Sequence, residues 1–496
     1  MYKIREIQYS SSSISIQVYY IKNRKRKIIR HIGTAKNNSE KENLIQLAQD
    51  FIKRISKQLT LFENEQSNKI LNLTQSEFIG VYYSFYYELL HKILIQIGFD
   101  KHKINLLLDL IIIRLFEPSS TLRAIELLDE YFGIKHRRQS YYDSAPKWLD
   151  LKEKTEKIVL NFAKKHYAFE YDLLFYDVTT LYFEAFEEDE LRKNGFSKDN
   201  KSQQPQILIA LMVSKDGFPI TYEIFAGNTF EGHTIIPVIK DFISKNRVNE
   251  FTVVADAAMI SSKNIEELTE NKINYIVGAR LGNISKELFN TIDKTLIRED
   301  GKITRIKTEN GYLICNFSSV RYRKDRYEMQ KQIEKAKTVV ANPSKSKKTK
   351  FIQSKAEKLE LNQSLIEKTE KLLGIKGYYT NIKESIVSNQ HIIKHYHSLY
   401  KVEQAFRISK NDLQTRPIFH YKEEPIKLHI LICFMALVAS KHIELKTNTS
   451  IRNFNHECKK VTDARILNKI TNKEFRLRAK LNDKVTDYLQ KLNLLT

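Results

Sequence analysis

The stretch Asp172-Leu-Leu-Phe-Tyr-Asp177-Val-Thr-Thr-Leu-Tyr-Phe183 marks a change from helical to strand-like sequence. Its apolar, aromatic and β-branched side chains are typical of a buried β-strand. Four more such runs follow along the chain, at residues 206–213, 218–225, 251–256 and 275–278. A helical pattern at residues 262–270 separates the last two runs. Strands followed by a strand–helix–strand unit predict an α/β fold, with a mixed five-stranded sheet flanked by helices.

Two acids in these runs are candidates for chemistry. Asp177 lies in the middle of the first run, where a carboxylate is costly unless it is paired or bound to a cation. Asp256 ends the fourth run just before a helix, at the strand end where α/β sheets usually place their sites. Each also has a structural explanation, since Asp177 could accept hydrogen bonds at a sheet end and Asp256 could cap a helix.

A third acid belongs to the helix-like run from Tyr396 to Lys410. One stripe of a regular helix there carries Tyr396, Leu399, Glu403, Arg407 and Lys410. An acid one or two turns away from a guanidinium, an ammonium and a phenol suits a metal ion beside a phosphate backbone. Taken alone, Glu403 could instead form an exposed ion pair with Arg407, which would contribute little to stability.

The bulk composition points to a large, basic protein. The chain has 496 residues, so we expect about two to four domains. Its formal net charge is +23, from 82 Lys and Arg against 59 Asp and Glu. That charge favours a polyanionic partner, with nucleic acid ahead of an anionic membrane. A genome rich in A and T would also raise the lysine content, so charge alone does not decide the function.

We expect a soluble protein of a reducing cytosol. The cysteines Cys315, Cys433 and Cys458 are widely spaced and indicate neither a disulfide framework nor a zinc knuckle. The N-terminal residues lack the apolar core of a signal peptide. The apolar runs Leu106–Leu115 and Leu428–Ser440 are too short to cross a bilayer and predict buried helices.

Several chemistries have no support in the sequence. The 13 histidines lack zinc-ligand spacing, no P-loop motif supports a nucleotide cofactor, and no nucleophile elbow supports a serine hydrolase. Three acids from two strands and a helix can instead hold two Mg²⁺ ions about 4 Å apart. Mg²⁺ binds a few carboxylates together with waters and phosphate oxygens, so it needs no His or Cys ligands.

The signature around the third acid resembles that of a known family. The chain is similar to DDE-type bacterial insertion-sequence transposases of the subgroup marked by Tyr-(2)-Arg-(3)-Glu-(6)-Lys. Here the corresponding residues are Tyr396-(2)-Leu399-(3)-Glu403-(6)-Lys410, so three of the four signature positions match.

The wider context of the signature is similar too. Leu174–Leu181 and Val253–Met259 resemble the family's first and second acidic strands, and Leu413–His420 resembles the stretch after its glutamate. The resemblance spans about residues 170–440. It implies a ribonuclease-H-like fold that carries an inserted subdomain between the second Asp and the Glu.

The resemblance also implies roles for individual residues. Tyr396 and Lys410 would contact DNA phosphates near the scissile end, and we add Arg407 because it shares their helical stripe. The expected cofactor is a pair of Mg²⁺ ions, which Mn²⁺ can replace. The catalytic, metal-binding triad would consist of Asp177, Asp256 and Glu403.

The chain departs from the family's pattern at two points. Leu399 stands where the signature has arginine, so that phosphate contact is missing or comes from Arg407 or Lys401. Better-studied members of the subgroup stack a flipped base on a tryptophan of the insertion. The single tryptophan of this chain, Trp148, precedes the first acid, so a Tyr or Phe would have to provide such stacking.

The sequence predicts six segments along the chain. The basic turn Lys22–Lys27 would be the tip of the N-terminal hairpin, and a lysine-rich tract, Ser344–Lys350, falls in the insertion. The segments are an N-terminal β-hairpin and helix (1–60), a helical DNA-end-binding region (61–170), the first part of the catalytic core (171–280), an inserted subdomain (281–377), the second part of the core (378–445) and a basic C-terminal tail (446–496).

The predicted function is cut-and-paste transposition. The protein would bind the terminal inverted repeats of its element, cut a strand at each end and join the 3′-hydroxyls to target DNA. Its partners would be double-stranded DNA and a second copy of the chain, without a membrane or a nucleotide cofactor, in the cytoplasm at the nucleoid. Two alternatives stay open: a stand-alone metal-dependent nuclease on the same fold, and a non-catalytic DNA-binding protein derived from a transposon.

Overall fold

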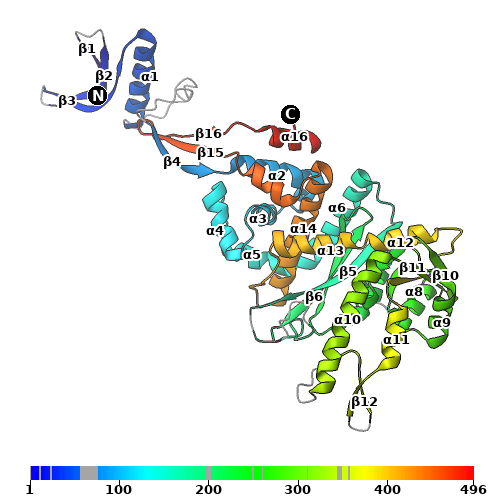
Figure 1. Cartoon of the computed structure of the whole chain (residues 1–496). Helices are drawn as coiled ribbons and strands as arrows, with labels where there is room; N and C mark the ends of the chain where they lie inside the picture. The colour runs from blue at the N-terminus through cyan, green and yellow to red at the C-terminus, as the bar shows by residue number, and fades with distance from the viewer. Residues whose placement is uncertain are drawn as a thin grey trace. The chain divides into compact units, whose positions relative to one another are not determined.

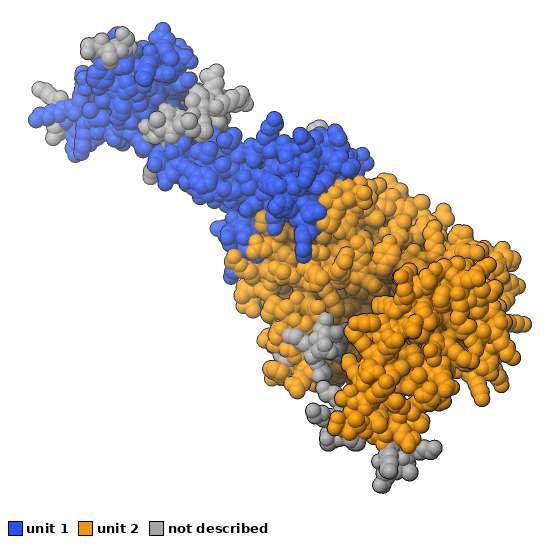
Figure 2. All heavy atoms as spheres, in the orientation of Figure 1, with its two compact units in different colours: residues 1–92, 126–135, 452–496 blue, residues 93–125, 136–451 orange. Residues whose placement is uncertain are grey.

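The computed structural model describes residues 2–9, 13–22, 25–55, 76–184, 186–196, 203–248, 251–259, 261–309, 311–342, 349–355 and 358–495. The chain divides into two compact units (Figure 2), residues 1–92, 126–135 and 452–496 in the first and residues 93–125 and 136–451 in the second. Helices α2 (Ser84–Ile97) and α4 (Thr121–Phe132) are divided between them. All candidate site residues belong to the second unit.

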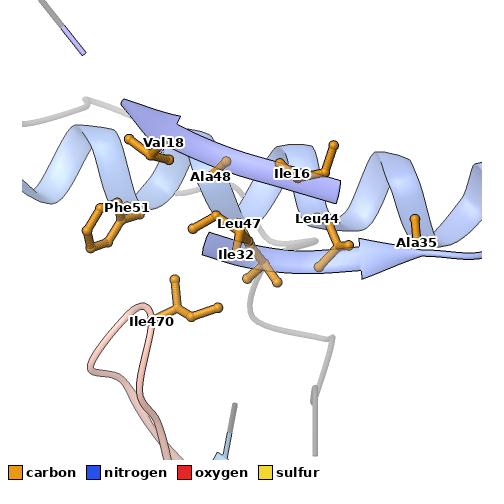
Figure 3. Packing of buried hydrophobic residues seen from close by; sticks show 9 residues of the cluster. All are labelled: Ile16, Val18, Ile32, Ala35, Leu44, Leu47, Ala48, Phe51 and Ile470. Atoms are coloured by element: carbon orange, nitrogen blue, oxygen red, sulfur yellow. The ribbon is translucent and has the colours of Figure 1, made fainter. Parts of the chain in front are cut away.

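The first unit begins with a three-stranded antiparallel sheet. Its strands are β1 (Tyr2–Gln8), β2 (Ile14–Lys22) and β3 (Lys25–Ala35), and α1 (Asn38–Ile55) follows. The predicted hairpin is present as β2 and β3, but the prediction missed β1, and part of the basic turn, residues 23–24, lies outside the described residues. The small core of sheet and helix (Figure 3) consists of Ile16, Val18, Ile32, Ala35, Leu44, Leu47, Ala48, Phe51 and Ile470.

The C-terminal segment, which we predicted to be a basic tail, contains strands and helices. β15 (Asp463–Asn468) pairs antiparallel with both β16 (Glu474–Arg478) and β4 (Ser76–Tyr82). β4 is a strand in a region whose pattern predicted only helices. Its partner lies far away in the sequence, so a local pattern does not reveal the pairing. The helices of this segment are α15 (Ile451–Cys458) and α16 (Asp483–Lys491).

One long apolar helix of the second unit, α14 (Glu423–Thr447), contacts α3 (Asn105–Phe116), α6 (Trp148–Tyr167) and strand β7 (Pro219–Ala226). α14 is long and apolar enough to cross a membrane, but 94% of its apolar stretch is buried within the fold, so it is a core helix. Both apolar runs of the sequence therefore form buried helices, as predicted. Other helices of the second unit are α5 (Arg138–Ser144), α7 (Ile235–Asn246), α8 (Ser262–Glu270), α12 (Asn389–His397) and α13 (Tyr400–Arg407).

The central sheet of the second unit is mixed, as predicted, and its strands β5, β6, β10 and β11 are labelled in Figure 1. Among the described residues its strand order is β10-β11-β14-β9-β8-β5-β6-β7. β5 pairs antiparallel with β6 and parallel with β8, and β8 pairs parallel with β9. The five predicted strands are all present and adjacent, as β5 (Leu173–Tyr182), β6 (Gln206–Ser214), β7 (Pro219–Ala226), β8 (Thr252–Ala255) and β9 (Asn274–Ala279).

The predicted number of five strands was wrong, because the described sheet has eight. The inserted segment adds β10 (Ile303–Thr308) and β11 (Gly311–Phe317), and β14 (Ile375–Thr380) joins them to β9 in antiparallel pairs. Alternation in the sequence indicates a strand, but the neighbour of that strand is set by contacts distant in sequence.

The rest of the inserted segment has a small core of its own. Met329 and Ala336 pack with Phe351, Ile366 and Leu373. Part of the lysine-rich tract, residues 343–348, lies outside the described residues. The elements of the segment are α9 (Lys286–Thr295), α10 (Ser319–Ala341), β12 (Ile352–Lys355), β13 (Lys358–Leu361) and α11 (Gln363–Lys371).

Candidate active site

The two predicted aspartates lie next to each other on neighbouring parallel strands. Tyr176 of β5 pairs with Ala255, the last residue of β8, and each acid is the next residue of its chain segment. Because parallel neighbours lie about 4.8 Å apart, Asp177 and Asp256 start from adjacent backbone positions. Asp177 is half-buried and accepts a hydrogen bond of 2.8 Å from the backbone N–H of Val178, whereas Asp256 is exposed.

Tyr396 connects helix α12 to this strand end. Its hydroxyl donates a hydrogen bond of 2.9 Å to Oδ1 of Asp256. Burial and, next, the charge of Asp256 raise the pKa of Tyr396 well above its ordinary value, so the phenol keeps its proton. The ring fits because residue 278 of β9 is glycine, where a Cβ atom would lie 2.5 Å from the hydroxyl oxygen of Tyr396. The first signature residue therefore contacts the second acid.

Glu403 approaches the same region from a helix. It is exposed in the first turn of α13, which packs against β5 and β6. Burial and the nearby Arg321 lower the pKa of Lys376 on β14. The charges of Asp256 and Glu403 act on that pKa in the opposite direction, so one ammonium group senses both acids. Within the described part of the chain, no three His, Cys, Asp or Glu side chains form a preassembled metal cluster.

The predicted regular helix from Tyr396 to Lys410 consists of three segments. The turn between α12 and α13 is tightened by i→i−3 bonds, such as the one of 3.0 Å from the N–H of Leu399 to the carbonyl of Tyr396. A π-helical turn, Ile408–Asp412, then widens the end of α13. The prediction of one uninterrupted stripe was wrong, because seven residues here no longer make two regular turns.

The two cations that follow Glu403 consequently have different surroundings. Arg407 is exposed at the last residue of α13. Lys410 is half-buried in the π-turn, where it lines a small, mainly apolar cavity with side chains of β5, β6 and α14. Of these two cations, Arg407 is accessible at the surface and Lys410 is only partly so.

Two cations that the sequence did not indicate lie beside Asp256. Arg321 of α10 and Lys376 of β14 line one cavity with Asp256 and Tyr396. Leu399, at the signature's arginine position, is buried with 6% of its surface exposed. The alternation around Lys376 could have indicated a strand, but no local signal predicts that this strand pairs with β9 and reaches the acid.

A family comparison covers this whole site. The sequence matches the family described as Transposase DDE domain over residues 168–439, which is more than half of the chain. The chain belongs to this family. The match runs from just before β5 into α14, so it includes both aspartates and Glu403. The protein is thus a DDE transposase, of a family that acts in DNA transposition and recombination and generally uses divalent metal ions.

Other comparisons add little to this assignment. A comparison with curated proteins finds no match. Among solved structures, the transposase is similar to the piggyBac transposase in a synaptic complex with hairpin DNA, determined by cryo-EM. The similarity covers 91% of this chain and 77% of that chain, with 12% sequence identity and a TM-score of 0.36. A similarity of this size supports no conclusion about the fold or the activity.

Proposed function

We propose that this transposase carries out cut-and-paste transposition of an insertion sequence. It would bind the terminal inverted repeats, cut a strand at each end and join the 3′-hydroxyls to target DNA by in-line attack on phosphorus. The observation that carries the proposal is the adjacency of Asp177 and Asp256 in the register of β5 and β8, with Tyr396 bonded to the second acid. Antiparallel partners on one side of β5 and parallel ones on the other are consistent with a ribonuclease-H-like core.

The three acids suit divalent cations by their donor chemistry. Asp177, Asp256 and Glu403 offer carboxylate oxygens, which are hard ligands that Mg²⁺ and Mn²⁺ accept. Asp256 and Glu403 are exposed, so cations can reach them. We propose that the three acids hold two such ions, which when bound activate the attacking hydroxyl and stabilise the leaving oxygen.

The protein's own hydrogen bonds would orient these acids. The protonated phenol of Tyr396 donates to Oδ1 of Asp256 and so restrains the rotation of that carboxylate. We further propose that Tyr396, Arg407 and Lys410 contact DNA phosphates near the cut. Arg407 would do so from the exposed end of α13, and Lys410 from the π-turn.

Recognition of the transposon ends would fall to residues 1–165. The basic strand β3 and the sheet that carries it offer a cationic surface for this purpose. We propose that a homodimer holds the two ends on double-stranded DNA in the cytoplasm, as expected for the subgroup with the Tyr-Arg-Glu-Lys signature. The catalytic core would comprise residues 171–280 and 378–445, the insertion residues 281–377, and the C-terminal segment residues 446–496.

Cleavage of a duplex that carries the element's end tests this proposal. With Mg²⁺ or Mn²⁺ the protein should nick the duplex at the terminus. Glu403→Gln should bind the duplex but not cut it, because the amide keeps the shape of the side chain without its charge. Gln404→Ala, on the same helix, should cut normally. Equal cutting by Glu403→Gln would refute the role of the third acid, and cutting without strand-transfer products would favour a stand-alone nuclease.

A further inference from the structure

The cations beside Asp256 border a cavity of about 290 Å³. Its walls come from β9, β14 and α10, together with Tyr396 of α12. Arg321 and Lys376 supply two positive charges to the lining, and Asp256 supplies the single acid among the described residues there. The cavity therefore lies against the second acid of the site and is more positive than negative.

These cations are poorly neutralised within the protein. Lys376 forms no ion pair within the described part of the chain, and its ammonium lies 4.5 Å from the ring centroid of Tyr396. Arg321 pairs through Nε with Asp325 at 3.3 Å, which engages one of the five N–H donors of its guanidinium. The effect of Arg321 on the pKa of Lys376 shows that the two like charges repel each other. An anion bound between them would remove that cost.

Arg321 and Lys376 offer positive charge to a site that lacks the arginine of the signature. Leu399 replaces the signature's arginine and is buried, and Lys401 donates a hydrogen bond to the carbonyl of Lys215 at the turn after β6. We propose that Arg321 and Lys376 bind a backbone phosphate of the DNA strand that passes Asp256, next to the phosphate that is cut. This inference rests on the proposed function, because that function brings DNA to the site.

The chemistry of the pair favours a phosphate as the occupant. The planar guanidinium of Arg321 can donate two parallel hydrogen bonds to phosphate oxygens, and the ammonium of Lys376 acts as a compact point charge. Lys376 also senses both Asp256 and Glu403, so it would hold the strand close to the acids that act on it. The inserted segment would then provide part of the active site as well as extending the sheet.

Binding measurements without divalent metal test this site in the absence of cutting. The full-length protein in EDTA is titrated onto a duplex that ends in the element's inverted repeat, at several salt concentrations. The double variant Arg321→Ala/Lys376→Ala should bind about tenfold more weakly and lower the salt slope by about one, since one phosphate contact is lost. Lys376→Arg should retain most of the affinity, and Arg326→Ala, on the same helix but outside the cavity, should leave affinity and slope unchanged.

A neutral phosphate analogue locates the contact. Methylphosphonate at the linkage beside the cut should weaken binding by the wild-type protein but not weaken the double variant further, because that contact is already lost. An unchanged affinity and salt slope in the folded double variant would overturn the proposal. Equal losses on the methylphosphonate duplex for both proteins would also overturn it, because the pair would then contact a different group.

Two further readouts separate folding and function from the site itself. Circular dichroism reports whether the double variant is folded. If it is not, Lys376→Gln, a single polar and uncharged replacement, is used for the same binding measurements. If the wild-type protein neither cuts nor joins DNA while the methylphosphonate pattern holds, the proposed function fails and the phosphate site stands. If it cuts DNA while that pattern is absent, only the phosphate site is refuted.

Discussion

Two clusters of charged side chains in the second unit are built in opposite ways. In the first, which we call the closed cluster, the buried ammonium of Lys152 donates to Glu156 at 2.8 Å and to Glu223 at 2.5 Å, so opposite charges neutralise one another. The second, which we call the open cluster, consists of Asp256, Arg321 and Lys376. Here the hydrogen-bond partner of Asp256 among the described residues is the neutral phenol of Tyr396, so its charge is not neutralised by that partner. Charges that neutralise one another in the core belong to the fold, whereas unneutralised charges of both signs beside a cavity are available to ligands.

The largest effect should come from the open cluster. Asp256→Asn should lower the cutting rate by about 1000-fold or more, because a metal ion held by this carboxylate would stabilise the transition state by several kcal/mol. Its melting temperature should stay the same or rise, since the variant removes an exposed charge that no cation pairs within the described residues. Gel assays of cutting and thermal melting check the two halves. A lower melting temperature with normal cutting would place Asp256 among the structural acids.

The closed cluster should show the reverse behaviour. Lys152→Ala should lower the free energy of unfolding by about 3–5 kcal/mol, because it leaves two carboxylates without their buried cation. Cutting per folded molecule should not change. Urea unfolding measures the loss, and Lys337→Ala, which breaks an exposed pair with Glu334, should cost under about 1 kcal/mol. Equal midpoints for the two variants would show that the closed cluster is dispensable.

Tyr396→Phe sharpens the comparison at the border of the open cluster. The variant keeps the ring but loses the hydrogen bond to Asp256, so cutting should fall by about 10- to 100-fold, as for other residues that orient a metal ligand. A higher Mg²⁺ concentration should restore part of the rate. Tyr378→Phe is the matched control, because it removes a hydrogen bond of 3.1 Å to His397 instead. Identical Mg²⁺ dependence in both variants would contradict an orienting role for Tyr396.

The sequence indicated Asp177 and Asp256 as candidates but not the cation Lys376 beside Asp256, and the reason is physical. Asp177 lies in the apolar strand β5 and Asp256 directly follows the apolar strand β8, so the local pattern specifies both the strand and the unusual charge. Lys376 reaches the site only because β14 pairs with β9, and that pairing depends on contacts far apart in the sequence. For the same reason the prediction stopped at five strands and missed the pairing of β4 with β15.

The helix of the third acid shows a different limit. Its residue spacing predicted one stripe, and the contact between Tyr396 and Asp256 agrees with a site on that face. Periodicity assumes a constant number of residues per turn, however, and neither the tight turn at Leu399 nor the π-turn at Ile408–Asp412 has a signal in the composition. Lys410 was consequently predicted on one helical stripe with Arg407, whereas it lies half-buried in the π-turn.

A buried histidine, His429 of α14, gives the smallest predicted effect. Burial and, next, the charge of Arg114 lower the pKa of His429 to about 3, and its ring forms a hydrogen bond of 3.1 Å with the carbonyl of Thr415. In the unfolded chain this histidine takes up a proton near its ordinary pKa of 6.5. Its contribution to stability is therefore complete above pH 6.5 and is lost progressively as the pH falls from there toward 3.

At pH 5.5 this loss should reach about 1.4 kcal/mol for His429. Urea unfolding at pH 7 and 5.5 measures it, and His429→Gln should remove that share of the difference, whereas the exposed His456→Gln should not. Equal pH dependence in the two variants would mean that the burial of His429 does not limit stability in acid. A clear difference would show that the buried core around α14 keeps His429 neutral, whereas the carboxylate of Asp256 is exposed.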